Sequence, residues 1–338
     1  MSDRQPAHPS RCRPGARTTA VTAVVSMLVA VLPALAARPA EASNPDTARV
    51  AAQGNPAPAG AVLAVTGSDG AGYVRAGGDA SWTRRGGILV SAPAVARVNG
   101  LTHQIGVNTF GALVHRTSHT GWRAFSPAGG RCDRPTAAVR RRTVVVSCIA
   151  PDGSARWFSF DGTTPHPAPS RLRSLGGRVS SLQVATSEES EVFVAVGGPY
   201  RLTNTETGQR IEANTYFRTA ADLNWFKLGY RCDGHPASAM TEHTWFMACN
   251  SGDSILVVTG DAEQDAYTTY SVPGVAAGLT SVVATSPQDA TLFVQGLDGY
   301  VRHRSISLAG PVATAWTQLS GRARYGVAAG PMSDMRAG

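Results

Sequence analysis

The residues of this chain whose types and spacing indicate chemistry most directly are four cysteines in two pairs. Cys132 is followed by Cys148 and Cys232 by Cys249, at separations of 16 and 17 residues, and each pair begins with an Arg-Cys-Asp tripeptide. β-Rich runs flank a polar midpoint in both pairs, so each pair is predicted to face across one antiparallel hairpin and to form a disulfide. Zinc binding is the alternative, but both pairs lack the close C-x2-C spacing of zinc knuckles.

Other residue types that carry out catalysis form no recognisable motif. The eight His residues include no H-E-x-x-H motif, and no G-x-S-x-G sequence is present. Gly252-Asp253-Ser254-Ile255 is similar to the nucleophile block of one lipase class, but its place between two β-rich runs predicts a turn. We interpret the clustered Glu188, Glu189 and Glu191 as a polar loop between two strands. Glycoside hydrolysis needs two carboxylates held across a cleft, and no such pair can be located from the sequence. No metal and no cofactor are predicted, and an enzymatic function stays open.

The first 42 residues have the order of a secretory signal peptide. Basic residues precede an apolar run from Ala20 to Ala37, and Ala40-Glu41-Ala42 provides a small-residue cleavage site. An uncleaved membrane anchor is the alternative, because the run approaches the length that spans a bilayer. We therefore predict a signal peptide over 1–42, a linker over 43–59 and a folded domain over 60–338. Export to an oxidising compartment agrees with the even number of cysteines that follow the leader.

The charge of the chain is positive but dispersed. The whole sequence has a net charge of +8, and residues 1–42 contain five Arg and two acidic residues, which leaves +5 for the remainder. No basic stripe indicates nucleic-acid binding, so we predict a secreted monomer without a nucleic-acid partner. Arg140-Arg141-Arg142 is the densest basic cluster. It is predicted to be a solvated hairpin turn, with binding of an anionic cell-wall polymer as the alternative.

Runs of β-branched and aromatic residues bounded by Gly, Asp, Pro and Ser predict an all-β fold. Turn signals and tryptophans recur so that the chain divides into six units of about 49 residues. Each unit is predicted to form a four-stranded antiparallel blade of a six-bladed β-propeller, with seven blades as the alternative. One blade is expected to combine Tyr325–Ala329 with Ala61–Val65, so that strands from the two ends of the chain close the ring.

Most of residues 60–330 resembles the repeats of tectonin-like and fucose-binding β-propeller lectins of bacteria and fungi, and the resemblance is strong in two or three units. Those repeats combine a Gly-x-Asp-Gly turn, an aromatic-hydrophobic-Arg/His strand and a Trp-x-x-Leu-Gly-Gly element. The segment Phe293–His303 with Trp316–Gly321 matches best, and Gly67–Arg75 with Trp82–Gly87 is next. The cysteine pairs depart from the family repeat, and the Trp-Gly-Gly element is missing near residues 270–278.

The resemblance implies a binding module for a glycan or a cell-surface polysaccharide, in which aromatic rings stack on sugar beside Arg or His donors. Recurrent tryptophans can also pack between neighbouring blades, which is the more common role. A propeller-fold glycoside hydrolase or lyase, and a structural or protein-binding envelope component, remain the alternative functions. The residues to which the resemblance assigns ligand binding are Tyr300, Arg302, His303 and Trp316 in the best-matching unit, and Tyr73, Arg75 and Trp82 in the next.

Overall fold

The computed structural model describes residues 55–197, 202–203, 210–211, 214–222, 224–242, 244–261, 267–311 and 314–332. This part of the chain consists of antiparallel strands joined by turns and contains no α-helix, which confirms the predicted all-β class. Accordingly, no helix in the described ranges has the length and apolar character needed to cross a bilayer. The predicted signal peptide and most of the predicted linker lie outside the described residues.

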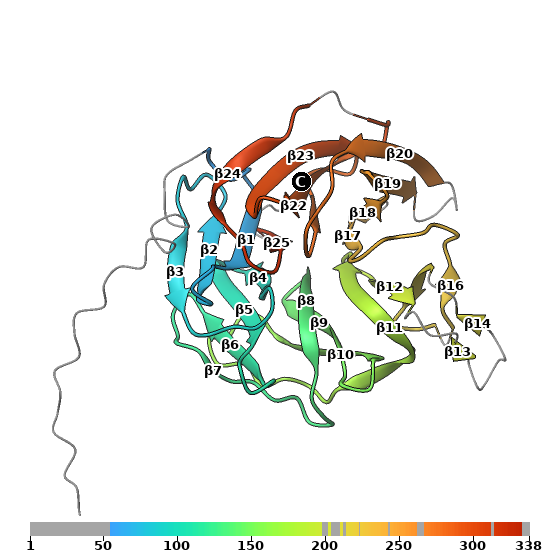
Figure 1. Cartoon of the computed structure of the whole chain (residues 1–338). Helices are drawn as coiled ribbons and strands as arrows, with labels where there is room; N and C mark the ends of the chain where they lie inside the picture. Colours follow the sequence, from blue (N-terminus) through green and yellow to red (C-terminus); the bar gives the residue numbers. More distant parts are fainter. Residues whose placement is uncertain are drawn as a thin grey trace, which may run out of the picture. The chain divides into compact units, whose positions relative to one another are not determined.

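Four sheets of four strands each account for much of the described chain (Figure 1). The first contains, in spatial order, β25 (Val327–Pro331), β1 (Ala61–Thr66), β2 (Gly72–Ala76) and β3 (Thr83–Gly86). The second contains β4 (Ala94–Val98), β5 (Leu101–Val107), β6 (Leu113–Thr117) and β7 (Arg123–Ala124). The other two contain β17 (Ala237–Met240), β18 (Thr244–Ser251), β19 (Ser254–Asp261) and β20 (Tyr267–Pro273), and β21 (Ser281–Ala284), β22 (Asp289–Gln295), β23 (Tyr300–Ser307) and β24 (Thr317–Arg322).

A seven-stranded sheet consists of two four-stranded arrays that share the long strand β11 (Arg173–Thr186). Residues 173–178 of β11 pair with β10, and residues 179–186 pair with β12, so the two halves of β11 belong to different arrays. The remaining strands are β8 (Asp133–Arg140), β9 (Thr143–Ile149), β10 (Ser154–Asp161), β12 (Glu191–Gly197), β15 (Thr215–Thr219) and β16 (Phe226–Lys227). A separate two-stranded ribbon is formed by β13 (Leu202–Thr203) and β14 (Arg210–Ile211).

The innermost strands of these arrays contact one another in a closed order. β25 contacts β4, and the contacts continue through β8, β11, β17 and β21 back to β25. Parallel bridges from Arg97 to Met332 and from Leu279 to Gly326 join β25 to its two neighbours. Figure 1 shows the arrays standing around a common centre, with their outermost strands at the periphery. This radial arrangement of antiparallel sheets is a β-propeller.

Apolar side chains on both faces of the inner strands hold neighbouring sheets together. All six residues of β1 are buried, as are the last six residues of β9, which explains why these segments are continuous apolar runs rather than alternating ones. One core joins the first sheet to the sheet of β21 to β24 through Leu63, Tyr73 and Phe293. The outermost strands are more exposed, as in β3 and β20. Burial therefore decreases from the centre of the ring to its rim.

The four cysteines form the two predicted disulfides. Cys132 is bonded to Cys148 and Cys232 to Cys249, with Cα atoms 5.6 and 5.5 Å apart. The first cysteine of each pair lies in the segment that leads into an innermost strand, β8 or β17, and the second lies on the adjacent strand. Arg141 has a φ of 56° at the tip of the β8–β9 hairpin, which confirms the predicted turn.

The closing strand lies where the sequence predicts it, with a shifted start. β25 pairs antiparallel with β1, with Ala64 opposite Ala328. The strand begins at Val327 rather than at Tyr325, because Gly326 has a φ of 108° and packs directly against Leu279. Residues before β1 also contact the first sheet, since Ala57 is buried in its core.

Candidate functional site

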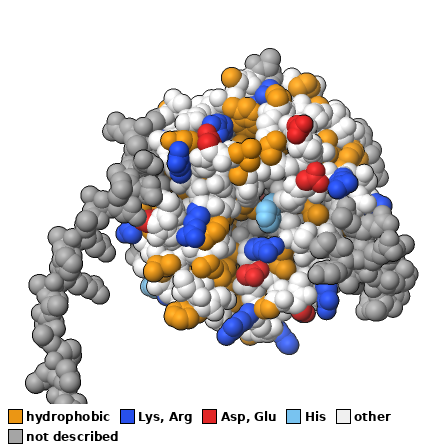
Figure 2. Space-filling model, in the orientation of Figure 1, with side chains coloured by type: hydrophobic (Ala, Val, Ile, Leu, Met, Phe, Trp, Pro, Cys, Tyr) orange, Lys and Arg blue, Asp and Glu red, His pale blue; other side chains and the backbone are white. Residues whose placement is uncertain are grey.

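Three cavities open on the face of the ring where the innermost strands begin, which we name the cavity face. The beginnings of the innermost strands and the segments just before them line the central one of these cavities. The β5–β6, β9–β10 and β22–β23 turns contribute to the other two. Figure 2 shows the molecule as a surface, with a histidine and Lys or Arg side chains beside a hollow near its centre. We name the cavity at the centre the central cavity, and the cavity beside β23 the outer groove.

The outer groove lies between the segment after β20 and the sheet of β21 to β24. It has a volume of ≈ 410 Å³, within the range of about 300–1,000 Å³ of small-molecule sites. One wall is the half-buried indole of Trp316, whose Nε1 donates a hydrogen bond of 2.7 Å to the carbonyl oxygen of Pro273. Leu297 borders the groove and is 80% exposed. The groove therefore offers an aromatic and aliphatic surface to solvent.

Arg302 and Asp298 are the charged residues that line the outer groove, and two partners fix the position of Arg302. Its Nη1 and Nη2 donate hydrogen bonds of 2.7 and 2.6 Å to the two carboxylate oxygens of Asp298, and Nη2 also donates to Gln318 Oε1 at 3.0 Å. The bonds from Arg302 lower the pKa of Asp298 to about 2, so the carboxylate is ionised at neutral pH. The pair presents planar donors and acceptors beside the indole of Trp316.

Arg302 occupies a position that a buried tyrosine fills in two other arrays. Tyr73 lies three residues after Gly70, as Arg302 lies three residues after Gly299, so the two turns align these residues with each other. The sequence match of Tyr73-Val74-Arg75 with Tyr300-Val301-Arg302 is therefore out of structural register by two residues. The strand partners of Tyr73, Tyr216 and Arg302 are Val65, Ala195 and Val294, each two residues before a Gly.

The substitution of arginine for tyrosine accompanies a difference in cavity size. A cavity lined by Tyr216 and Trp225, the residues at the positions of Arg302 and Trp316, has a volume of only ≈ 10 Å³. Trp225 is buried there, whereas Trp316 is half-buried. Among the described cavities, the site beside Trp316 is thus an open groove, whereas the equivalent site beside Trp225 in the array of β12 and β15 is nearly filled.

The other two residues predicted in this unit lie outside the lining of the outer groove. Tyr300 packs beneath the guanidinium of Arg322, 5.0 Å from its ring centre. His303 lies against Phe293, and burial, followed by the charge of Arg75, lowers its pKa. Its Nε2 is buried without a hydrogen-bond partner among the described residues. The structure therefore brings Arg302 and Trp316 together and leaves Tyr300 and His303 in packing positions.

The predicted residues of the first unit are buried. Tyr73 and Arg75 are each 0% exposed and Trp82 is 4% exposed. The Tyr73 hydroxyl donates to Asp69, and the Arg75 guanidinium lies over the Trp82 ring at 5.8 Å while donating to the neighbouring sheet at Ser320. These three side chains present no surface to a ligand, and we do not include them in the site.

Arginine–tryptophan pairs of this kind join sheets at three places. Arg116 lies over Trp122 at 5.9 Å, and both donate to the backbone carbonyl of Arg85 in the preceding sheet. Trp122 also donates to the carbonyl of Gly86 at 2.9 Å. The recurrent tryptophans thus pack between neighbouring arrays. The other two pairs are Arg75 with Trp82 and Arg218 with Trp225.

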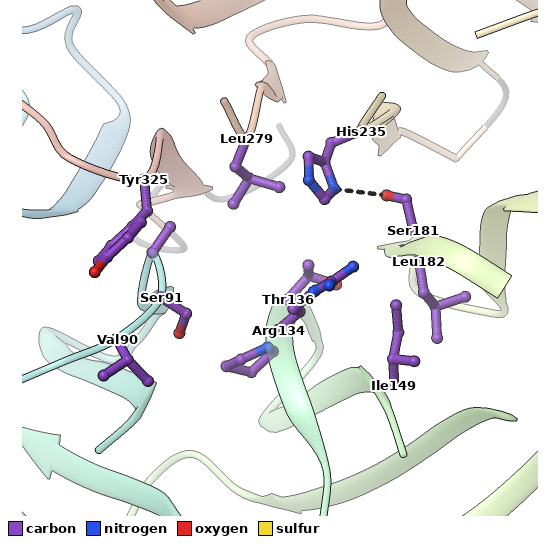
Figure 3. Close-up of a pocket in the computed structure, with 12 residues that line it drawn as sticks. Val90, Ser91, Arg134, Thr136, Ile149, Ser181, Leu182, His235, Leu279 and Tyr325 are labelled. Atoms are coloured by element: carbon purple, nitrogen blue, oxygen red, sulfur yellow. Dashed lines mark hydrogen bonds between the residues drawn. The ribbon is translucent and has the colours of Figure 1, made fainter. Parts of the chain in front are cut away.

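The central cavity was not anticipated by sequence reasoning. It has a volume of ≈ 300 Å³ and collects at least one lining residue from each innermost strand or from the segment just before it. Arg134 and His235 are its basic residues (Figure 3). A signal for both was present, since Arg134-Pro135 and His235-Pro236 each follow one of the repeated Arg-Cys-Asp tripeptides. The six positions are Ser91, Arg134, Ser181, His235, Leu279 and Tyr325.

The described lining of the central cavity carries basic and hydroxyl side chains. His235 Nδ1 and Ser181 Oγ are hydrogen bonded at 2.9 Å, and burial, followed by the charge of Arg134, lowers the pKa of His235. The described residues that line the cavity include no Asp or Glu, whereas glycoside hydrolysis uses a pair of carboxyl groups. In the described ranges, no group of three or more His, Cys, Asp or Glu side chains is placed to hold a metal ion.

No protein-family model and no curated protein sequence matches this chain. Among solved structures, TolB from Acinetobacter baumannii has a TM-score of 0.52 at 10% identity, and the match covers 80% of this chain and 66% of that chain. BP39L lectin from Burkholderia pseudomallei has a TM-score of 0.49 at 14% identity, covering 78% and 81%. A GH43_1 enzyme from Xanthomonas citri has a TM-score of 0.44 at 13% identity, covering 67% and 91%. At these identities the TolB match supports the β-propeller fold alone.

Proposed function

We propose that this protein is a carbohydrate-binding β-propeller and that the outer groove is its binding site. The observation that carries the proposal is the combination, in one open groove, of a half-buried Trp316, an exposed Leu297 and the fixed pair of Arg302 and Asp298. Aromatic and aliphatic side chains can cover the apolar face of a sugar ring, and fixed donors and acceptors can orient its hydroxyls.

The Asp298–Arg302 pair suits a neutral sugar better than an anionic one. The three bonds that Arg302 makes to Asp298 and Gln318 use three of its five N–H groups, and its charge is already balanced by the carboxylate. Sugar hydroxyls can accept from the remaining N–H groups and donate to the carboxylate lone pairs. Because no net charge is neutralised on binding, affinity should change little between low and high salt.

We further propose six blades, with β11 counted in two of them, in a secreted monomer that resembles tectonin-like and fucose-binding lectins. The innermost strands of the ring support this count, and the two disulfides are compatible with export. The alternative site is the turn at Arg141, at the tip of the β8–β9 hairpin, where an anionic polymer would bind if the outer groove is not the binding site.

A glycan array with the purified protein tests the proposal. Wild type should bind a restricted set of neutral glycans, and Trp316→Ala should abolish that signal. Trp316→Phe keeps an aromatic ring without the bond to the Pro273 carbonyl, so it should retain part of the binding and separate stacking from packing. Arg302→Gln should weaken the affinity about tenfold or more, because a hydrogen bond to a charged group is lost.

Arg156→Gln is the matched control. Arg156 lies three residues after Gly153, the register position of Arg302, but in the array of β10. It should bind glycans as wild type does. If every variant keeps its circular dichroism spectrum and Trp316→Ala binds as wild type does, the outer groove is not the site. If wild type binds no arrayed glycan, the carbohydrate function itself is excluded in favour of a structural or protein-binding role.

A further inference from the structure

The central cavity has features that the outer groove does not explain. Figure 3 shows Tyr325 and Ser91 on one side, His235 and Ser181 on the opposite side, and Arg134 between them. Apolar side chains, among them those of Leu182 and Leu279, complete the walls. A volume of ≈ 300 Å³ that opens on the cavity face can hold a compact molecule that is partly apolar.

The backbone directs Arg134 in an unusual way. Its φ of 48° lies in the left-handed region, which only Asn99 and Arg141 share among the described non-glycine residues. Those two residues lie in tight hairpin turns, where this conformation is expected. Arg134 instead lies at an irregularity in the pairing of β8 with β9. Irregularities of this kind redirect a side chain, and a strained non-glycine residue suggests a functional requirement.

The guanidinium of Arg134 makes one hydrogen bond to the protein and keeps most of its donors available. Its Nη1 donates a hydrogen bond of 2.9 Å to the backbone oxygen of Ser180, and it makes no other hydrogen bond to the described residues. Four of its five N–H groups therefore remain for a ligand. Ser91 adds a further donor, because its hydroxyl is buried without a partner among the described residues.

The balance of charge selects an anion with a single charge. Burial lowers the pKa of His235, so its imidazole is neutral at neutral pH and Arg134 supplies the positive charge of the cavity. No described lining residue is acidic. The nearest acid along the chain, Asp133, lines the adjoining cavity, which Ser91 and Arg134 also border. Burial raises the pKa of Asp133, and the charge of Arg134 opposes that rise. A planar guanidinium matches a carboxylate through two parallel hydrogen bonds.

The two disulfides hold the segments that carry the basic side chains. Cys132 lies two residues before Arg134, and Cys232 lies three residues before His235. A proline follows each basic residue, and a residue before proline normally adopts an extended conformation. Arg134 departs from this preference, since its φ is 48°. The repeated Arg-Cys-Asp units thus place a cation and a neutral imidazole on the same cavity.

We propose that the central cavity is a second binding site, for a small organic monocarboxylate whose carboxyl group pairs with Arg134 and whose body contacts the apolar wall. Acidic sugars and other small carboxylic acids share this chemistry. The site is separate from the outer groove, and either can fail without the other.

Calorimetric titration of the full chain with glucuronate, benzoate, glucose and inorganic phosphate tests the proposal. Glucuronate or benzoate should bind with one-to-one stoichiometry at millimolar concentration, and glucose should not bind at this site. Binding of glucuronate alone identifies an acidic sugar as the ligand, and binding of both identifies the carboxylate as sufficient. Tighter binding of phosphate than of either carboxylate would overturn the choice of a monoanion.

Arg134→Gln should weaken carboxylate binding about tenfold or more. Arg134→Gly accepts the positive φ without strain, so it should be folded and equally impaired. Arg141→Gln is the matched control, because Arg141 has the same residue type and a similar φ at the far end of the same strand. It should bind as wild type does, and so should Trp316→Ala, which tests the outer groove instead. Equal binding by wild type and both Arg134 variants, or no binding of either carboxylate at millimolar concentration, would overturn the proposal.

Discussion

At the scale of single residues, the most unusual environment is that of His103 and His115. Both imidazoles are fully buried, and His115 stacks on Phe125 with ring centres 4.7 Å apart. His103 Nε2 is 2.9 Å from the carbonyl oxygen of Gly162, which can only accept, so this nitrogen carries the proton in the neutral pair. His103 Nδ1 then accepts from His115 Nε2 at 3.0 Å. His115 Nδ1 is left buried and without a partner among the described residues.

We expect this pair to make the fold sensitive to acid. Burial, followed by the nearby charges of His103, Arg123 and His166, lowers the pKa of His115 to about 3. As the pH falls, His115 binds a proton near pH 6.5 in the unfolded chain but only near pH 3 in the folded chain. The contribution of the neutral His115 to the free energy of unfolding is therefore fully present above about pH 6.5 and is lost as the pH falls towards 3. The loss between pH 8 and pH 5 should be about 2 kcal/mol from His115 alone.

Denaturant unfolding at the two pH values measures this loss. His115→Phe keeps an aromatic ring against Phe125 and should reduce the pH dependence of the free energy of unfolding. The contribution of His103 to that dependence should remain, because burial also lowers the pKa of His103. His119→Gln, at an exposed histidine of the turn after β6, should behave as wild type does. An unchanged pH dependence in His115→Phe would show that other groups cause the loss.

At the scale of elements, the two disulfide-bonded hairpins, β8–β9 and β17–β18, form part of the centre of the ring. Each disulfide joins the segment just before an innermost strand to the strand that pairs with it. All four bonded cysteines are buried. Beyond the bond, β8 is anchored at its far end by an ion pair between Arg140 and Glu191. The hairpin is therefore fixed at both ends, which keeps the segment with Arg134 in place.

Replacing Cys132 and Cys148 together by Ala should lower the free energy of unfolding by about 3 kcal/mol, because a closed loop of this length constrains the unfolded chain. The fold should persist, since the buried apolar strands remain. Denaturant unfolding followed by circular dichroism measures both effects. Loss of the β spectrum in the double variant, without denaturant, would mean that the hairpin depends on its disulfide. The corresponding Cys232 and Cys249 double variant provides the comparison.

At the scale of the whole molecule, ring closure depends on a single strand. β25 pairs with β1, all of whose residues are buried, and it also contacts β4 and β21. Removing β25 would leave the backbone groups of β1 unpaired at an apolar edge, and such an edge promotes aggregation. Loss of this one strand is therefore expected to destabilise the whole propeller.

Deleting residues 324–338 should therefore cause aggregation or a large drop in melting temperature, measured by size-exclusion chromatography and thermal unfolding. Deleting residues 333–338 alone spares β25 and is the matched control, expected to behave as wild type does. A 324–338 deletion that stays monomeric and melts at the temperature of wild type would contradict the role of β25 in closing the ring.

Features that depend on nearby residues could be predicted from the sequence. Cysteine spacing is a property of one hairpin, so the pairing of Cys132 with Cys148 and of Cys232 with Cys249 was predictable. Strands such as β1 and β9 were recognisable because strands buried on both faces are continuous apolar runs. The partner of β1 near the end of the chain followed from counting repeats, although the start of β25 depended on the φ of Gly326.

The openness of the outer groove and the existence of the central cavity depend on contacts between residues far apart in sequence. Trp316 and Trp225 occupy equivalent positions in their arrays, yet Trp316 borders an open groove beside Arg302 and Trp225 borders a nearly closed cavity beside Tyr216. The residues that line the central cavity lie between positions 90 and 325. Those contributed by different arrays are not adjacent in the sequence. Local patterns carry no information on such convergence, since it is set by how the arrays pack around the ring.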